Sequence, residues 1–225
     1  CMACVLAWQP PINRPLNIKP PCDGKGSPEH SPLPNKTAPG PAEKYIFLDR
    51  DGVINRDSDA YVKSWAEFEF LPGSLAALKK LTLAGYRIIV ITNQSIIGRR
   101  WVSLETLEDI FTRMRAEIEK NGGRIHAIFF CPHTPGDGCG CRKPATGLIE
   151  KAARVYGIDI ATTTLVGDSA KDILCARRAG CKQAVLVKTG NYATAAEILH
   201  QENVTPDWVA ADLLEAVDWI LEGDK

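Results

Sequence analysis

Residues 45–52, which read YIFLDRDG, decide the fold class of this chain. Four apolar residues in a row are typical of a short strand inside a parallel sheet, because such strands are covered on both faces. Asp49 and Asp51 follow at a spacing of two, which in extended backbone turns both side chains to the same side. The stretch therefore predicts a buried strand that ends in two carboxylates.

The chain beyond this strand alternates between short apolar runs and amphipathic stretches. The runs, rich in β-branched residues, lie at 87–91, 125–130, 163–166 and 184–187. Helical periodicity fills the intervals, at 74–84, from 103 to the glycines at 122 and 123, 147–156, 170–179, 193–200 and 213–221. Strands separated by helices imply right-handed crossovers. The pattern predicts an α/β fold with a doubly wound parallel sheet of the Rossmann type.

The first 43 residues differ in composition from the rest. They hold ten of the fifteen prolines and show neither helical nor strand periodicity. We therefore expect a disordered proline-rich tail over residues 1–43 and one folded domain over residues 44–225.

The charge balance excludes several classes of partner. Lys plus Arg equals Asp plus Glu at 27 each, so no overall positive field attracts nucleic acid or an anionic membrane. No apolar run approaches the roughly 20 residues needed to span a bilayer, and the first ten residues lack the basic flank of a secretory signal. We expect a cytoplasmic monomer with no nucleic-acid or membrane partner.

Polar side chains follow the apolar runs directly. In parallel sheets ligands bind outside the carboxyl ends of the strands, so these side chains mark the candidate site. Four runs contribute, ending in Asp49 and Asp51, in Thr92, Asn93 and Gln94, in the segment 131–143, and in Gly167 and Asp168.

The paired carboxylates predict a magnesium site. Like charges at this spacing need a cation, and Mg²⁺ prefers a few carboxylates together with water and substrate phosphate. Asp168 is the natural further ligand from another strand end. Asp-x-Asp-Gly alone is equally typical of a surface turn, but its place after a buried strand favours function.

A second metal site is predicted in the segment 131–141. Cys131, His133, Cys139 and Cys141 supply three thiols and an imidazole among prolines and glycines, which form no hydrophobic core. Four such ligands suit a closed, structural zinc site that would fold the loop. The alternative is a disulfide pair with a free histidine, which a reducing compartment disfavours.

Together these motifs resemble those of the haloacid dehalogenase-like phosphatases, and within them the branch of heptose-bisphosphate and histidinol-phosphate phosphatases. The resemblance covers residues 44–191. It is carried by Asp49-x-Asp51, Thr92, Lys143 and Gly167-Asp168-x-x-x-Asp172, and by the stretches 48–55, 92–95 and 131–144.

The resemblance implies a role for each catalytic residue. Asp49 would be the nucleophile that forms an aspartyl-phosphate. Asp51 would be the general acid and base, and its backbone carbonyl would bind magnesium. Thr92, Asn93 and Lys143 would hold the phosphoryl oxygens.

Further residues are implied around this centre. Asp168 would complete the metal site, with Asp172 one helical turn later as its support. Arg142 would grip a second phosphate or sugar hydroxyls, although a solvated surface arginine is its plain alternative. Weaker substrate contacts are expected from the loop after the first strand, namely Asp57, Ser58, Asp59 and Tyr61, and from Gln94 at the second strand end.

The spacing of the motifs predicts that no cap domain covers the site. The intervals from Asp51 to Thr92 and from Thr92 to Lys143 are each used up by loops, one helix and one strand. The loops 57–65, 95–101 and the zinc loop should therefore cover it. Ile96 and Arg100 depart from the small, glycine-containing stretch of similar proteins and are expected to add bulk and charge beside the phosphate pocket. An isoleucine would be strained there if the backbone needs a positive φ.

The expected activity is magnesium-dependent removal of the 7-phosphate from a heptose 1,7-bisphosphate, a step toward lipopolysaccharide or similar surface glycans. Histidinol-phosphate phosphatase is the nearest alternative, because it shares the motifs and a similar zinc loop. Removal of terminal phosphates from nucleic acid conflicts with the neutral charge balance. A zinc-stabilised binding module without catalysis is the alternative from another class. The anomer of the sugar stays open.

Overall fold

The structure is a computed structural model that describes residues 6–8 and 43–223. Its strands are β1 (Leu6–Trp8), β2 (Lys44–Leu48), β3 (Tyr86–Asn93), β4 (Ile125–Cys131), β5 (Thr164–Gly167), β6 (Gln183–Val187) and β7 (Trp208–Ala210). Its helices are α1 (Ser74–Leu83), α2 (Ser95–Gly98), α3 (Leu104–Lys120), α4 (Gly147–Tyr156), α5 (Ala170–Ala179), α6 (Tyr192–Gln201) and α7 (Leu213–Gly223). Short 3₁₀ turns lie at Trp65–Glu67, Pro135–Asp137 and Ile160–Thr162.

The strands form one sheet in the order β1-β4-β3-β2-β5-β6-β7. All pairs from β4 to β7 are parallel, and β1 pairs with β4 antiparallel. From β2 the chain builds outward to β3 and β4 on one side, and from β5 to β6 and β7 on the other. The order of winding therefore reverses between β2 and β5, which is where ligands bind in sheets of this kind.

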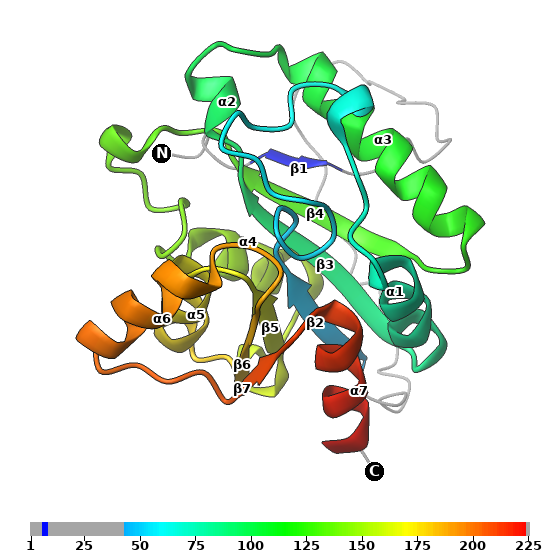
Figure 1. The fold of residues 1–225 in the computed structure, drawn as a ribbon, viewed down its shortest axis with the longest axis vertical. Helices are drawn as coiled ribbons and strands as arrows, with labels where there is room; N and C mark the ends of the chain where they lie inside the picture. Colours follow the sequence, from blue (N-terminus) through cyan, green and yellow to red (C-terminus); the bar gives the residue numbers. More distant parts are fainter. Residues whose placement is uncertain (1–5, 9–42, 224–225) are drawn as a thin grey trace, which may run out of the picture. The chain divides into compact units, whose positions relative to one another are not determined.

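Helices cover both faces of the sheet (Figure 1). α1, α3 and α7 pack on the core that contains Ile46 and Leu48. α4, α5 and α6 pack on the opposite core, which contains Tyr45 and Phe47. Alternate residues of one strand thus enter opposite cores, so every residue of the predicted apolar run is buried.

Local signals set the ends of the helices. Ser103 precedes α3 and accepts a hydrogen bond from the backbone N–H of Thr106. Ser169 and Asp172 form a capping box at the start of α5. α4 ends at Gly157, whose φ of 67° is favourable only for glycine.

The predicted fold class is confirmed, and so are the helices and strands on which it rests. No cap domain interrupts residues 49–143, all of which the structure describes. Two short strands were not predicted. β7 has only three residues, and the expected tail contributes β1, which pairs with the edge strand β4. An edge strand offers unpaired backbone groups, and even three residues can use them. The rest of the expected tail lies outside the described residues.

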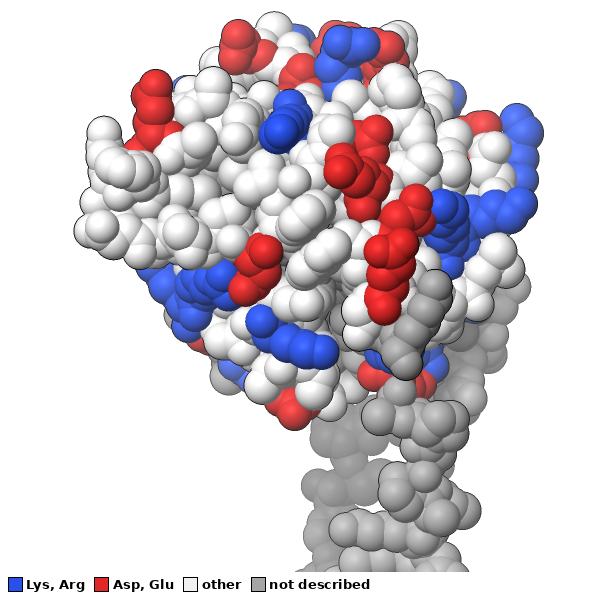
Figure 2. All heavy atoms as spheres, turned by 60° about the horizontal axis from the view of Figure 1, so that its bottom comes forward, with Lys and Arg blue, Asp and Glu red and all other residues white. Residues whose placement is uncertain are grey.

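The surface agrees with the balanced charge of the sequence. Figure 2 shows acidic and basic side chains interspersed over one face. Within residues 6–8 and 43–223, none of the helices has the length and hydrophobicity to cross a membrane.

Candidate active site

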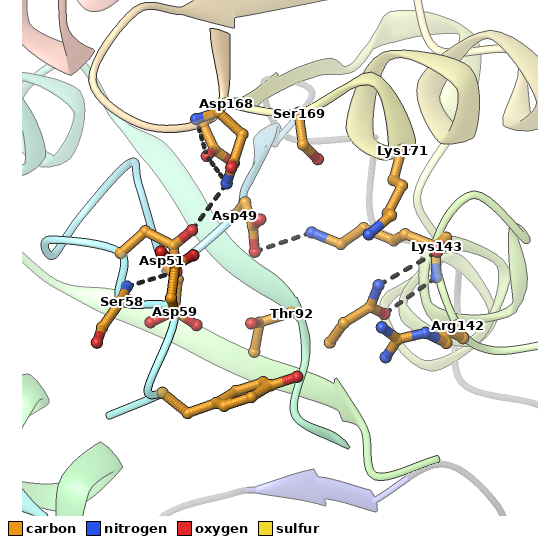
Figure 3. A pocket seen from close by; sticks show the side chains of 14 residues that line it. Asp49, Asp51, Ser58, Asp59, Thr92, Arg142, Lys143, Asp168, Ser169 and Lys171 are labelled. Atoms are coloured by element: carbon orange, nitrogen blue, oxygen red, sulfur yellow. Dashed lines mark hydrogen bonds and ion pairs between the residues drawn. The ribbon is translucent and has the colours of Figure 1, made fainter. Parts of the chain in front are cut away.

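A cavity of about 310 Å³ opens at the carboxyl ends of the strands (Figure 3). Three of the strands around the switch point supply its floor, with Asp49 after β2, Thr92 and Asn93 at the end of β3, and Asp168 after β5. Loops supply the wall. The further lining residues are Asp51, Asp57, Ser58, Asp59, Tyr61, Arg142, Lys143, Ser169, Lys171 and Asn191.

Lys143 is the buried cation of the site. Its Nζ lies 2.8 Å from Asp49 Oδ1 and 2.5 Å from Asp172 Oδ1, and it donates a hydrogen bond to the carbonyl of Ile91 at 2.9 Å. Burial would lower the pKa of Lys143, but the Asp172 and Asp49 carboxylates outweigh it and raise that pKa above its ordinary value. The side chain is therefore a fixed ammonium beside Asp49.

The charge around Asp49 is not balanced by this lysine. Burial raises the pKa of Asp49 well above its ordinary value, Lys143 opposes the rise, and the charges of Asp172 and Asp168 add to it. Three carboxylates share one ammonium here. A further cation would be needed to balance the negative charge of these three carboxylates.

Asp51 is surrounded by hydrogen-bond donors. Arg50 donates to its Oδ1 from Nε at 3.0 Å and from Nη2 at 2.6 Å, and Asn55 Nδ2 donates to the same oxygen at 2.9 Å. Gln94 Nε2 donates to Oδ2 at 2.8 Å. Burial raises the pKa of Asp51, but these donors outweigh it, led by the Arg50 guanidinium, so the pKa lies below its ordinary value. In the free site Asp51 is a carboxylate.

Asp168 is held against backbone on two sides. A Cβ at Gly52 or at Gly190 would overlap its carboxylate, so both positions require glycine. Asn191 donates to Asp168 Oδ2 from its backbone N at 2.9 Å and from Nδ2 at 3.2 Å. Burial and the charge of Asp172 raise the pKa of Asp168 to about 7.

The outer wall is formed by loops. Arg142 donates to the carbonyl of His133 at 3.2 Å, and this bond ties it to the zinc-loop segment. Tyr61 has a φ of 59° and packs edge-on against Trp101, with ring centroids 5.2 Å apart. Arg99 lies over both rings, at 6.0 and 5.1 Å. The wall of the cavity thus carries charges of both signs, Asp57 and Asp59 beside Tyr61 and the cations of Arg142 and Lys171.

The floor suits a hard divalent cation. One carboxylate oxygen from each of Asp49, Asp168 and Asp172 lies within 4.8 Å of the others. Asp172 is already engaged by Lys143 and by Ser169, whose Oγ donates to it at 2.5 Å. Asp49 and Asp168 are therefore the pair that faces such a cation, with Asp172 behind them.

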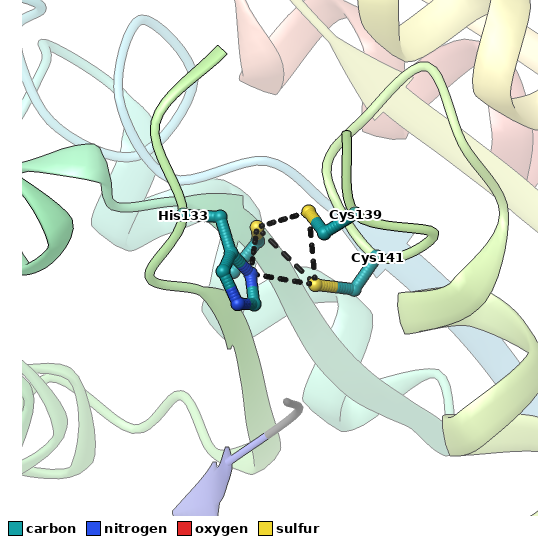
Figure 4. A group of neighbouring side chains, drawn as sticks. His133, Cys139 and Cys141 are labelled. Carbon is teal, nitrogen blue, oxygen red and sulfur yellow. Dashed lines mark hydrogen bonds between the residues drawn. The ribbon is translucent and has the colours of Figure 1, made fainter. Parts of the chain in front are cut away.

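The Cys/His cluster is assembled as expected (Figure 4). Its sulfur atoms and His133 Nδ1 lie 3.3 to 3.6 Å apart wherever they are in contact, and none of the three cysteines is in a disulfide. Four ligands about 2.3 Å from a tetrahedral zinc ion would lie about 3.8 Å apart. Burial raises the pKa of Cys131 to about 11 and that of Cys141 further. The donor set and its spacing fit zinc, which would hold the thiols as thiolates.

Most predicted site residues line the cavity, and two stand behind it. Gln94 is buried and donates to Asp51 and to Thr92 Oγ1 at 2.9 Å, so it contacts site residues and does not line the cavity. Asp172 lies behind Lys143.

The expectation for Ile96 is wrong. Its side chain is fully buried in the core that contains Ile46 and Leu48, and it does not line the cavity. Its backbone lies in α2 and has no positive φ. It adds no bulk beside the candidate phosphate pocket.

The sequence reasoning missed three lining residues. Asn191 follows β6 just as the other polar residues follow their strands, so the strand-end rule applied to 187–191 would have found it. Ser169 and Lys171 belong to the start of α5, and no motif marked them.

Comparisons with known proteins show the relatives of this chain. The family model described as HAD-hydrolase-like matches residues 140–216. D-glycero-β-D-manno-heptose-1,7-bisphosphate 7-phosphatase of Bordetella bronchiseptica is 48% identical over 148 residues, which are 66% of this chain and 82% of that protein. The chain belongs to this family of HAD-like phosphatases. Membership makes it a phosphoric monoester hydrolase.

Other members of this phosphatase family extend the likeness. D-glycero-α-D-manno-heptose-1,7-bisphosphate 7-phosphatase of Photorhabdus laumondii is 42% identical over 156 residues, or 66% of this chain and 84% of that protein. The crystal structure of the heptose-bisphosphate phosphatase from B. bronchiseptica, complexed with magnesium and phosphate, superposes with a TM-score of 0.75 at 42% identity. It covers 80% of this chain and 99% of that one.

Proposed function

We propose that this chain is a magnesium-dependent phosphatase that removes the 7-phosphate of D-glycero-D-manno-heptose 1,7-bisphosphate. The observation that carries the proposal is the buried Asp49–Lys143 pair at the switch point, facing Asp168 across the cavity. A related protein with magnesium and phosphate bound adds support. The proposal includes a cytoplasmic location, because charged sugar phosphates stay in the compartment where they are made. It also includes a monomeric state.

The first step forms a covalent intermediate on Asp49. A carboxylate oxygen of Asp49 attacks phosphorus, and the bond from phosphorus to the C7 oxygen breaks. Asp51, which takes up a proton from solvent when the substrate binds, gives that oxygen the proton. The products are the heptose 1-phosphate and an aspartyl-phosphate. In the second step water attacks the same phosphorus, Asp51 takes a proton from the water, and Asp49 leaves as a carboxylate.

The buried polar groups stabilise the charge that develops on the phosphoryl oxygens. The Lys143 ammonium and the Thr92 hydroxyl lie at the floor of the cavity, and Asn93 exchanges two hydrogen bonds with the Lys143 backbone, at 3.0 and 3.2 Å. Mg²⁺, held by Asp49, Asp168 and the Asp51 carbonyl, would screen the nucleophile from the anionic phosphate it attacks. Fixed charges in a dry site are most of what phosphoryl transfer requires.

The outer wall would select the rest of the substrate. Arg142 lines the cavity and is fixed by the zinc-loop backbone, so it is placed to bind the second phosphate or sugar hydroxyls. Asp57 and Tyr61 line the opposite wall. Zinc in the four-ligand cluster would be structural, because no coordination position is left for substrate.

Phosphate release with Mg²⁺ tests this proposal. We compare both anomers of heptose 1,7-bisphosphate with histidinol phosphate. Both anomers are included because each occurs in the name of a relative. We expect preferred release from the 7-position of the bisphosphate and loss of at least about 10³-fold in Asp49→Asn. Preference for histidinol phosphate would reassign the substrate, and an active Asp49→Asn protein would refute the covalent mechanism.

A further inference from the structure

Arg50 is a fully buried arginine whose position the catalytic motifs do not explain. Its side chain is 1% exposed and does not line the cavity, although it stands between Asp49 and Asp51 in the sequence. Its guanidinium lies over the ring of Phe111 at 5.8 Å. Within the described residues its salt bridge is with Asp51, and Nη1 makes no hydrogen bond.

Such burial lowers the stability of the fold. A buried cation with an unmade hydrogen bond is unfavourable unless its partner compensates for the lost hydration. The compensation here is directed at a single atom, Asp51 Oδ1, which receives both Nε and Nη2 of Arg50. Asn55, also buried, donates to the same oxygen.

The two oxygens of Asp51 are therefore unequal. A carboxylate oxygen has about two lone pairs, and three donors already occupy Oδ1. Oδ2 receives only the Gln94 amide among the described residues, which leaves it one lone pair. Asp51 lines the cavity, so this remaining lone pair is the one available to a proton and to the substrate.

We propose that Arg50 is a positioning residue that anchors Asp51 Oδ1, so that Oδ2 alone carries the proton in catalysis. The inference rests on the proposed phosphatase reaction. Asp51 is ionised in the free site, so Oδ2 takes up a proton from solvent when the substrate binds. In the first step this Oδ2–H bond breaks and its proton goes to the C7 oxygen as the phosphorus–oxygen bond breaks. In the second step Oδ2 regains a proton from the water that attacks phosphorus. Arg50 keeps its protons throughout and acts through Asp51, since its own side chain does not line the cavity.

The dependence on the leaving group tests this role. An alkoxide needs a proton to leave, whereas 2,4-dinitrophenolate leaves without one. We compare Arg50→Met with the unaltered protein in the first turnover, using Mg²⁺ and either heptose 1,7-bisphosphate or 2,4-dinitrophenyl phosphate. We expect the first turnover of the sugar to slow by about 100-fold. First-turnover release of dinitrophenolate should change by less than about threefold, and later turnovers of both substrates should slow, because Asp51 must also activate water.

Matched variants separate positioning from folding. Arg115→Met removes another buried arginine, on α3 and outside the cavity lining, and should show no dependence on the leaving group. Arg50→Lys keeps the charge but not the two-point contact, so it should give a smaller loss of the same kind. Asn55→Ala should do likewise, and either variant serves if Arg50→Met does not fold.

Equal first-turnover losses on both substrates, or no loss on either, would overturn the inference. Failure of the proposed function would look different. One sign would be that the unaltered protein does not turn over the heptose bisphosphate, and histidinol phosphate would then serve as the alkyl ester in the comparison. The other sign would be undiminished release of dinitrophenolate by Asp49→Asn.

Discussion

At the scale of single residues, Arg100 holds a conformation that its side chain disfavours. Its φ is 60°, in the left-handed region where a Cβ costs about 1–2 kcal/mol. The residue follows α2 and leads into Trp101, whose ring packs on Tyr61 of the cavity wall. The strain therefore lies in the loop that supports the outer wall.

Relief of this strain should stabilise the protein. We expect Arg100→Gly to raise the free energy of unfolding by about 0.5–1 kcal/mol, since the gain is partly offset by the greater freedom of glycine in the unfolded chain. Urea denaturation measures the change. Arg99→Gly is the control, because Arg99 has a φ of −76° and should lose about 1 kcal/mol there. Equal effects of the two variants would contradict the argument.

The Asp168 carboxyl should make magnesium binding depend on pH. Its pKa of about 7 without a cation means that the proton and Mg²⁺ compete for the same oxygens. Apparent affinity should rise as pH increases through about 7 and level off above it, since the ligand is then already ionised. Calorimetry at several pH values, in buffers of different ionisation enthalpy, measures the affinity and the released proton. A flat profile between pH 6 and 8 would refute this.

The raised pKa of Asp168 also affects stability in the absence of a cation. The folded state binds this proton more tightly than the unfolded state, whose pKa is near 3.8. The contribution of Asp168 is therefore fully present below that pH and is lost as pH rises to about 7. Added Mg²⁺ should restore stability at neutral pH by binding only the folded state.

At the scale of elements, the segment 131–141 has little regular secondary structure. Beyond its first residue it contains a single 3₁₀ turn and no helix or strand, while Cys131 and Cys141 are buried against the core of α4. Zinc bound by the four ligands would supply the order that a longer element obtains from packing. Arg142 directly follows this segment and lines the cavity, so disorder in the segment would also disturb the cavity wall.

Zinc removal should accordingly loosen this segment. We expect about one zinc per chain. Chelation should lower the melting temperature by at least about 5 °C, since 2 kcal/mol shifts a domain of this size by several degrees. Cys139→Ser should lower zinc content, whereas Cys175→Ser, a buried thiol outside the cluster, should not. Metal analysis and calorimetric melting decide between these outcomes, and an unchanged melting temperature after complete zinc loss would count against a structural role.

At the scale of the whole molecule, the sheet has two cores, and neighbouring residues of one strand belong to different ones. Phe129 packs with α4 and α5, while Phe130 packs with α1 and α3. A sheet with a solvated face would bury only every second residue. Helices cover both faces here, so truncation of a buried side chain on either face of the sheet leaves a cavity.

Truncation on either face should therefore be costly. We expect Phe129→Ala and Phe130→Ala each to lower the free energy of unfolding by about 3–5 kcal/mol, because each leaves a cavity in a packed core. Leu83→Ala, at 75% exposure, should change it by less than about 0.5 kcal/mol. Denaturant titration of the three variants measures this. A small loss for one phenylalanine alone would show that its face is not packed.

The sequence by itself determined the sheet, its helices and the main catalytic candidates. Apolar runs are buried wherever both faces are covered, and polar residues after them are left at one rim, so Asp49, Thr92 and Asp168 were predictable from position alone. The cluster of Cys131, His133, Cys139 and Cys141 was predictable because a segment without a core needs another source of order. The prediction for Ile96 was wrong because the direction of its side chain depends on α2. This helix has only four residues, and the hydrophobic pattern of the sequence does not reveal it.

Only the tertiary structure decided which side chains act on one another. Arg50 and Asp51 are adjacent in sequence, but nothing in the pattern shows that the arginine folds into the core and grips one oxygen of its neighbour. Asn191 contacts Asp168, which lies 23 positions earlier in the chain. Lys143, which follows β4, contacts Asp49, which follows β2. Local periodicity reports burial, whereas the charge and hydrogen bonding of a site depend on distances between segments that only the packed chain brings together.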